Sequence, residues 1–256
     1  METIETLIAD IGRHGALTSP FYALWQSRQF RIEELELFAS NYGAWVKSFP
    51  DALAILFEKT DDVHAKTEYA KTLFSEMGYG NPEKVHWVLL DEFFTMLGLR
   101  LGERERLSRK QREWNSHLLT TTVHLIEGER ELYGHGDRAI AAGAQLALEW
   151  QAYTMLRKLY EGARNYQKLW MNEDEFSEAC EYFYVHLGAA EKDHKQESLI
   201  AAQRLVNPFG FVNYGKDDIG IKEIQVGFNR HLDLIAGFWD GLYIKMQQLG
   251  HGTHDP

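Results

Sequence analysis

Cysteine, proline and basic residues are what this sequence of 256 residues has little of. The single cysteine, Cys180, excludes an internal disulfide and fits a reducing compartment, so we expect a cytoplasmic protein. Lys and Arg number 27 against 38 Asp and Glu, and the net charge of −11 disfavours nucleic acid or an anionic membrane as a partner. No stretch approaches the roughly 18 consecutive apolar residues of a membrane-spanning helix, so we expect none.

The alternation of apolar and polar residues that is typical of strands is also missing, and only 5 prolines interrupt long windows with helical periodicity. We therefore predict one all-α domain over residues 1–250, a bundle of about seven to nine helices, followed by a disordered tail at residues 251–256. The predicted helices span residues 2–12, 33–59, 61–77, 83–99, 103–128, 137–162, 173–205 and 222–248, with one more beginning at Ser19 and Pro20.

The segment from residue 182 to residue 198 carries the strongest functional pattern. Glu191 and His194 are three residues apart, so they share one face of a helix, and His186 lies about two turns earlier on nearly the same face. Two imidazoles and a carboxylate along one stripe indicate half of a site for iron, manganese or zinc. The alternative is a solvated helix face without a ligand.

Three residues elsewhere are candidates for the other half. Glu149 lies in a nearly uncharged stretch, where an ionised carboxylate is costly unless it is paired or bound to a metal. Glu76 ends a predicted helix, where the helix dipole disfavours an acid. His86 is flanked by apolar residues, and an ordinary core histidine is its alternative interpretation.

A second ligand set also fits the residues. Helical bundles of the ferritin type hold two irons with two Glu-x-x-His motifs and two further glutamates. That arrangement leaves His186 unused and replaces Glu76 with Glu83, an acid in a first helical turn, where acids are common for dipole reasons alone. Its six ligands would be Glu58, Glu83, His86, Glu149, Glu191 and His194.

The order of Glu76, His86, Glu149 and the pattern from His186 to His194 resembles the haem-oxygenase-like di-iron oxidases and oxygenases. Within that family, the sequence is most similar to the chlamydial death-domain-associating proteins, which form p-aminobenzoate, and to their cyanobacterial relatives. The similar stretches are residues 21–25, 41–50, 60–62, the region of Glu149 and residues 182–194.

This resemblance implies a haem-oxygenase-like (TenA/PqqC-like) fold that binds two Fe(II) ions, with manganese as the alternative metal and O2 as cosubstrate. The implied metal ligands are Glu76, His86, Glu149, His186, Glu191 and His194. One departure concerns the last motif, which has four residues between His186 and Glu191 where the family usually has three, and Glu in place of Asp. A π-bulge would absorb the extra residue; otherwise His186 or Glu191 is not a ligand.

The activity implied is that of a non-haem di-iron oxidoreductase, with Glu76 and Glu149 in catalytic roles. Its substrate would be a small, amino-acid-derived molecule of a biosynthetic pathway, oxidised by N-oxygenation, C–C cleavage, desaturation or nitrile formation. An external electron donor is a further candidate partner, and a homodimer is expected on base rates. The alternatives are a self-sacrificing p-aminobenzoate synthase that consumes Tyr22 and Lys158, and a non-enzymatic helical domain that binds a partner.

Aromatic residues are the candidates for the walls of the substrate pocket, with ordinary core packing as the alternative for each. They are Tyr42, Trp45, Phe49, Trp87, Trp150 and Tyr153.

Overall fold

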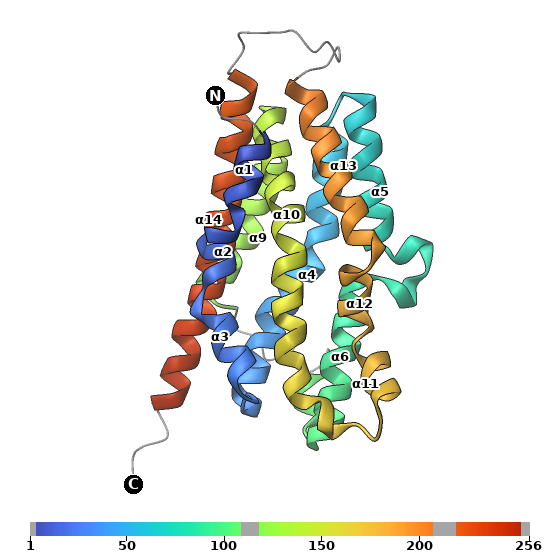
Figure 1. Cartoon of the computed structure of the whole chain (residues 1–256), viewed down its shortest axis with the longest axis vertical. Helices are drawn as coiled ribbons and strands as arrows, with labels where there is room; N and C mark the ends of the chain where they lie inside the picture. Colours follow the sequence, from blue (N-terminus) through green and yellow to red (C-terminus); the bar gives the residue numbers. More distant parts are fainter. Residues whose placement is uncertain (1–3, 109–117, 207–218, 252–256) are drawn as a thin grey trace.

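The computed structural model describes residues 4–108, 118–206 and 219–251, and these residues form helices and turns without a strand (Figure 1). The all-α prediction is therefore confirmed. Among the described helices, none is both long enough and apolar enough to cross a membrane.

Three long helices run along the bundle. They are α4 (Ile32–Lys59), α10 (Arg138–Ala163) and α14 (Ile219–His251). Helix α10 packs along α14 so closely that Gly143 and Gly227 admit no side chain: a Cβ on Gly143 would lie 2.0 Å from the Ile224 carbonyl oxygen. Small residues thus bring the two backbones together and bury most of α10, including Glu149.

Shorter helices lie on the two sides of α10 (Figure 1). On one side, α2 (Gly15–Thr18) and α3 (Pro20–Ser27) contact α14 and α10, and α1 (Ile4–Asp10) precedes them. On the other side, α5 (Val63–Glu76) packs against α13 (Ala189–Val206), and α6 (His86–Leu101) packs against α12 (Glu181–Leu187). The remaining helices are α7 (Arg104–Leu107), α9 (Thr120–Tyr133) and α11 (Glu173–Ala179).

Several of the largest buried side chains lie where α3, α4 and α14 meet. The Trp239 ring lies 4.8 Å from that of Phe21 and 5.7 Å from that of Tyr42, measured between ring centroids. Rings at such separations interact favourably beyond the burial of their apolar area. This aromatic core fixes Tyr42 and Trp45 of α4 against the interior.

Two helices begin at or within two residues of their predicted starts, and a third does not. Pro20 is the first residue of α3 and follows the N-cap Ser19, as predicted. Asp62 caps α5 by accepting a hydrogen bond from the Ala65 amide. The predicted helix over residues 83–99 is wrong at its start, because Asn81 caps only a 3₁₀ turn (Pro82–Lys84) and α6 begins at His86.

Two predicted helices are divided. The prediction of one helix over residues 103–128 is wrong, because α7 ends at Leu107 and α9 begins at Thr120. Residues 109–117 lie outside the described residues. The helix predicted over residues 173–205 is interrupted at Cys180 and again at Gly188. The predicted tail falls almost wholly on residues 252–256, which also lie outside the description.

Candidate metal centre

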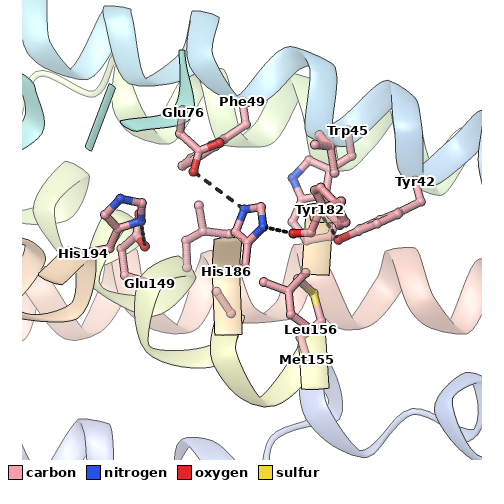
Figure 2. A pocket seen from close by; sticks show the side chains of 13 residues that line it. Tyr42, Trp45, Phe49, Glu76, Glu149, Met155, Leu156, Tyr182, His186 and His194 are labelled. Carbon is pink, nitrogen blue, oxygen red and sulfur yellow. Dashed lines mark hydrogen bonds and ion pairs between the residues drawn. The ribbon is translucent and has the colours of Figure 1, made fainter. Parts of the chain in front are cut away.

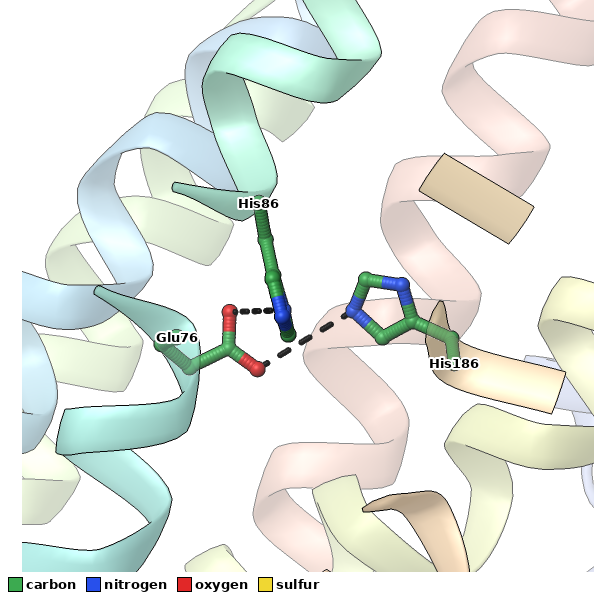
Figure 3. A group of neighbouring side chains, drawn as sticks. All are labelled: Glu76, His86 and His186. Carbon is green, nitrogen blue, oxygen red and sulfur yellow. Dashed lines mark ion pairs between the residues drawn. The ribbon is translucent and has the colours of Figure 1, made fainter. Parts of the chain in front are cut away.

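Glu76, His86 and His186 meet at the ends of three helices (Figure 3). Glu76 is the last residue of α5, His86 is the first of α6, and His186 is the penultimate residue of α12. The chain returns from Glu76 to His86 through a tight turn at Gly78, whose φ is 65°. A side chain there would meet the Lys84 backbone at 2.5 Å, so the turn requires glycine.

The donor atoms of these three residues all lie within 4.8 Å of one another. His86 Nδ1 is 2.9 Å from Glu76 Oε2, and His186 Nε2 is 3.9 Å from Glu76 Oε1. Despite the short distance, His86 Nδ1 forms no hydrogen bond of acceptable geometry with any described residue. Two ligands bonded to one ion at about 2.1 Å and at right angles are about 3 Å apart, so the spacing fits a shared ion.

The ring orientation of His186 suits a ligand. Its Nδ1 donates a hydrogen bond to the Tyr182 carbonyl at 2.7 Å, and a backbone carbonyl can only accept. The proton therefore lies on Nδ1, and the lone pair of Nε2 faces Glu76. Metal-bound histidines are commonly oriented in this way. Burial, together with the nearby His86, lowers the pKa of His186 to about 3, so the ring is neutral at pH 7.

Glu76 is the anionic member of the group. Burial acts to raise its pKa, but the imidazoles of His86, His186 and His194 outweigh burial and lower the pKa to about 2. Burial likewise opposes a charge on His86, and Glu76 outweighs that effect and raises the pKa of His86. A buried carboxylate surrounded by imidazoles is a site that attracts a cation.

A second buried pair lies close by, formed by Glu149 of α10 and His194 of α13 (Figure 2). His194 Nδ1 is 3.6 Å from Glu149 Oε2, and each residue is 3% exposed. His194 Nε2 is buried without a hydrogen-bond partner among the described residues, and burial lowers the pKa of this histidine. The structure thus brings together five of the six predicted ligands.

The sixth, Glu191, lies on α13, but its side chain is not among those that the structure describes. The π-bulge that was one of the two alternatives is not found between α12 and α13. Helix α12 ends at Leu187, and Gly188 adopts a non-helical conformation (φ −87°, ψ −152°) before α13 begins at Ala189. A helix break therefore absorbs the extra residue between His186 and Glu191.

Glu76 and His186 of the first group and Glu149 and His194 of the second line one cavity, in which water-sized molecules can reach about 60 Å³ (Figure 2). A water needs roughly 10–15 Å³ by this measure, so the space suits a few waters or one small group. Its lining comprises Tyr42, Trp45, Val46, Phe49, Glu76, Leu148, Glu149, Ala152, Met155, Leu156, Tyr182, His186 and His194.

Of the predicted aromatic walls, Tyr42, Trp45 and Phe49 line this cavity. Trp87, Trp150 and Tyr153 do not, and Tyr153 is 38% exposed, because these residues lie on other faces of their helices. Sequence reasoning missed Tyr182, whose hydroxyl shares a 2.7 Å hydrogen bond with that of Tyr42. Its position four residues before His186, on the same helix face, is the signal that could have identified it.

The ferritin-type ligand set is wrong. Glu58 and Glu83 are both exposed, and neither lines the cavity. Tyr22 and Lys158 lie together, with the Lys158 ammonium 5.2 Å above the Tyr22 ring, but neither is part of the cavity lining. The Tyr22 hydroxyl donates to the Ala16 carbonyl, and the Lys158 ammonium donates to the Leu17 carbonyl, each at 2.7 Å.

The chain belongs to the family of iron-containing redox enzymes, whose sequence model matches residues 36–208. Among characterised relatives, it is 30% identical to the 4-aminobenzoate synthase of Chlamydia muridarum (strain MoPn / Nigg) over 106 residues, which are 41% of this chain and 43% of that protein. The chain therefore spans less than half the length of this relative. It is 25% identical to the 4-aminobenzoate synthase of Chlamydia pneumoniae over 203 residues, covering 79% of this chain and 82% of that protein.

Solved structures show the same fold. A CADD-like protein of Nostoc punctiforme PCC 73102 superposes with a TM-score of 0.69 at 16% identity, covering 94% of this chain and 95% of the other. A domain with a haem-oxygenase-like fold from Shewanella denitrificans OS217 superposes with a TM-score of 0.63 at 14% identity, covering 98% and 94%. The haem-oxygenase-like fold predicted from the sequence is confirmed.

Proposed function

We propose that this protein is a non-haem di-iron oxidase or oxygenase that uses O2 to oxidise a small substrate. The carrying observation is the buried group of Glu76, His86 and His186, whose donor atoms lie within 4.8 Å of one another. The family of iron-containing redox enzymes supports iron as the metal. Mixed carboxylate and imidazole ligands suit iron, with manganese as the alternative.

Glu76, His86 and His186 would hold the first ion, and Glu149 and His194 the second, with Glu191 as a further ligand. When bound, the two ions would supply the electrons that reduce O2. The chain's own part is to keep His186 neutral through burial and to present its Nε2 lone pair through the hydrogen bond to Tyr182. It also keeps Glu76 ionised, because three imidazoles surround this carboxylate.

The remaining walls exclude water and select the substrate. Trp45, Phe49 and Leu156 give the cavity an apolar surface, and the Tyr42–Tyr182 hydroxyl pair offers a hydrogen bond. No lysine or arginine is present among the described lining residues. We therefore propose a small substrate, amino-acid-derived, that presents an apolar or amine-bearing portion to the cavity.

Anaerobic loading with ferrous iron tests this function. We expect about two Fe per chain and stoichiometric O2 uptake on exposure to air, both strongly reduced in His194→Ala. The matched control is His124→Ala, a histidine of α9 outside the cavity lining. A protein that binds no iron and consumes no O2 would rule the proposal out and favour a non-enzymatic domain that binds a partner.

Self-sacrificing synthesis of p-aminobenzoate is the second candidate. It is favoured by the similarity to two 4-aminobenzoate synthases and by the contact of Lys158 with Tyr22. It predicts product without added substrate, at no more than one turnover per chain, and loss of product in Tyr22→Phe. An unchanged yield in that variant would exclude Tyr22 as the source.

A further inference from the structure

Glu149 is the end of a buried hydrogen-bond chain that begins on a helix without candidate ligands. Tyr133, the last residue of α9, donates its hydroxyl proton to Gln145 Oε1. Gln145 Nε2 donates to Glu149 Oε1 at 2.6 Å. Tyr133 and Gln145 are completely buried, and neither lines the cavity.

The donor and acceptor in each of these two hydrogen bonds follow from the chemistry of the three side chains. A carboxylate can only accept, so the amide nitrogen of Gln145 must face Glu149. The amide oxygen then faces Tyr133, whose hydroxyl has to donate. Both hydrogen bonds therefore point toward Glu149 and stabilise its charged form in a place where burial disfavours charge.

The hydrogen bond from Gln145 also orients the Glu149 carboxylate. Gln145 engages Oε1, whereas Oε2 lies 3.6 Å from His194 Nδ1. Around Glu76, in contrast, three donor groups already converge. The orientation of the Glu149 carboxylate thus depends on side chains outside the ligand set, Gln145 and Tyr133.

We propose that Gln145 and Tyr133 are positioning residues that set the affinity of the second metal ion, so that the two ions bind with unequal strength. This inference rests on the proposed function. Hydrogen-bonding partners of metal ligands typically change metal affinity by about 10- to 100-fold when they are removed. The effect should fall on the weaker binding step alone.

Helix α10 offers a matched control. Gln151 lies on the same helix and is also completely buried, but its side-chain amide has no hydrogen-bond partner among the described residues. Replacing either glutamine with leucine removes the same buried amide group, and of the two only Gln145 donates a hydrogen bond to a proposed ligand. A purely structural role of buried amides would make the two substitutions similar in effect.

The experiment is an anaerobic titration of the full chain with ferrous iron against a competing chelator. We expect two binding steps in the wild type, with the weaker step shifted about 10- to 100-fold in Gln145→Leu and less in Tyr133→Phe. The stronger step should stay unchanged in both variants, and Gln151→Leu should leave both steps unchanged. Thermal unfolding of the metal-free variants, measured in parallel, separates metal affinity from folding.

An unshifted weaker step in both Gln145→Leu and Tyr133→Phe would overturn the inference, as would an equal shift in Gln151→Leu. If Gln145→Leu does not fold, Tyr133→Phe decides alone, since it removes only one hydroxyl. Absence of iron binding by the wild type would instead overturn the proposed function, so the two failures are distinguishable.

Discussion

Two buried glutamate–histidine pairs in this protein have nearly the same spacing and different geometry. Glu76 and His86 approach to 2.9 Å in the candidate metal centre, and Glu129 and His231 approach to 3.0 Å between α9 and α14. The second contact is a hydrogen bond, whereas His86 Nδ1 forms none of acceptable geometry with the described residues. Distance alone therefore does not distinguish a metal ligand from an ion pair.

The Glu129–His231 pair uses both nitrogens of its histidine. His231 Nδ1 donates to the Ala144 carbonyl at 2.7 Å, so a second proton must lie between Nε2 and Glu129 Oε1. The Trp45 indole donates to the same carboxylate oxygen at 3.4 Å. These contacts satisfy the imidazole fully, and the pair ties α14 to α9 and α10. The Glu76 group, in contrast, directs its donor atoms toward a common point, as a cation requires.

The largest effect on iron binding is expected at Glu76, the carboxylate of the first pair, and none at Glu129, the carboxylate of the second. Glu76→Gln should weaken iron binding by more than about 100-fold, because it removes a direct ligand and not only a residue that orients one. The metal-free protein should still fold, since glutamine has nearly the same shape as glutamate and keeps a hydrogen-bond acceptor. Anaerobic iron titration and urea denaturation measure the two quantities, and retained affinity would exclude Glu76 as a ligand.

For the Glu129–His231 pair, we expect a loss of stability without a loss of iron affinity. Glu129→Ala should lower the free energy of unfolding of the metal-free protein by about 3–5 kcal/mol, because it leaves His231 buried without its partner. The folded fraction should bind iron with wild-type affinity. Urea denaturation followed by circular dichroism provides the measurement, and a loss below 1 kcal/mol would mean that the pair contributes little.

Acidification should destabilise the metal-free protein through His186. Its pKa is about 3 in the folded chain and about 6.5 in an unfolded one, so the unfolded state binds a proton first as the pH falls below about 6.5. The stability contributed by the neutral ring is lost progressively down to pH 3, by about 2 kcal/mol between pH 7 and pH 5. The raised pKa of His86 acts in the opposite direction, because its contribution is present at low pH and is lost as the pH rises.

The measurable quantity is the difference in slope between the wild type and His186→Leu, obtained from urea denaturation at several pH values. A flatter pH dependence in the variant is expected. Equal slopes would show that His186 titrates normally in the folded protein.

The smallest effects are expected at the glutamates of the rejected ligand set. Glu58→Gln and Glu83→Gln should change the free energy of unfolding by less than about 0.5 kcal/mol and leave iron content unchanged, because both side chains are exposed. Metal analysis after anaerobic loading checks this. Loss of iron in Glu83→Gln would restore the ferritin-type ligand set.

The sequence predicts those residues of the candidate metal centre whose charge is unfavourable in their local sequence context. Glu149 is conspicuous in its uncharged helix, and Glu76 at a helix end that disfavours acids. The relation of His186 to Glu191 could not be predicted, because the break at Gly188 changes which residues share a face. The roles of Gln145 and Glu129 could not be predicted from the sequence, because their partners, Tyr133 and His231, lie on other helices.

In the fold, too, features that depend on neighbouring residues are predictable, whereas those that depend on helix packing are not. Capped starts such as Ser19 and Asp62 are readable from neighbouring residues, and so is the all-α class. The interruption at Cys180 has no comparable local signal. Which aromatic residues face the cavity depends on how the helices are rotated against one another, and Trp150 and Tyr153 were therefore assigned to the wrong face.

The central claim is that acids and imidazoles from separate helices bind two irons in one buried cavity. Anomalous diffraction at the iron edge from crystals loaded anaerobically tests it most directly. The account predicts two peaks, one bonded to Glu76, His86 and His186 and the other to Glu149 and His194. A map without iron at these residues, or with His86 hydrogen-bonded to Glu76 and no ion between them, would contradict it.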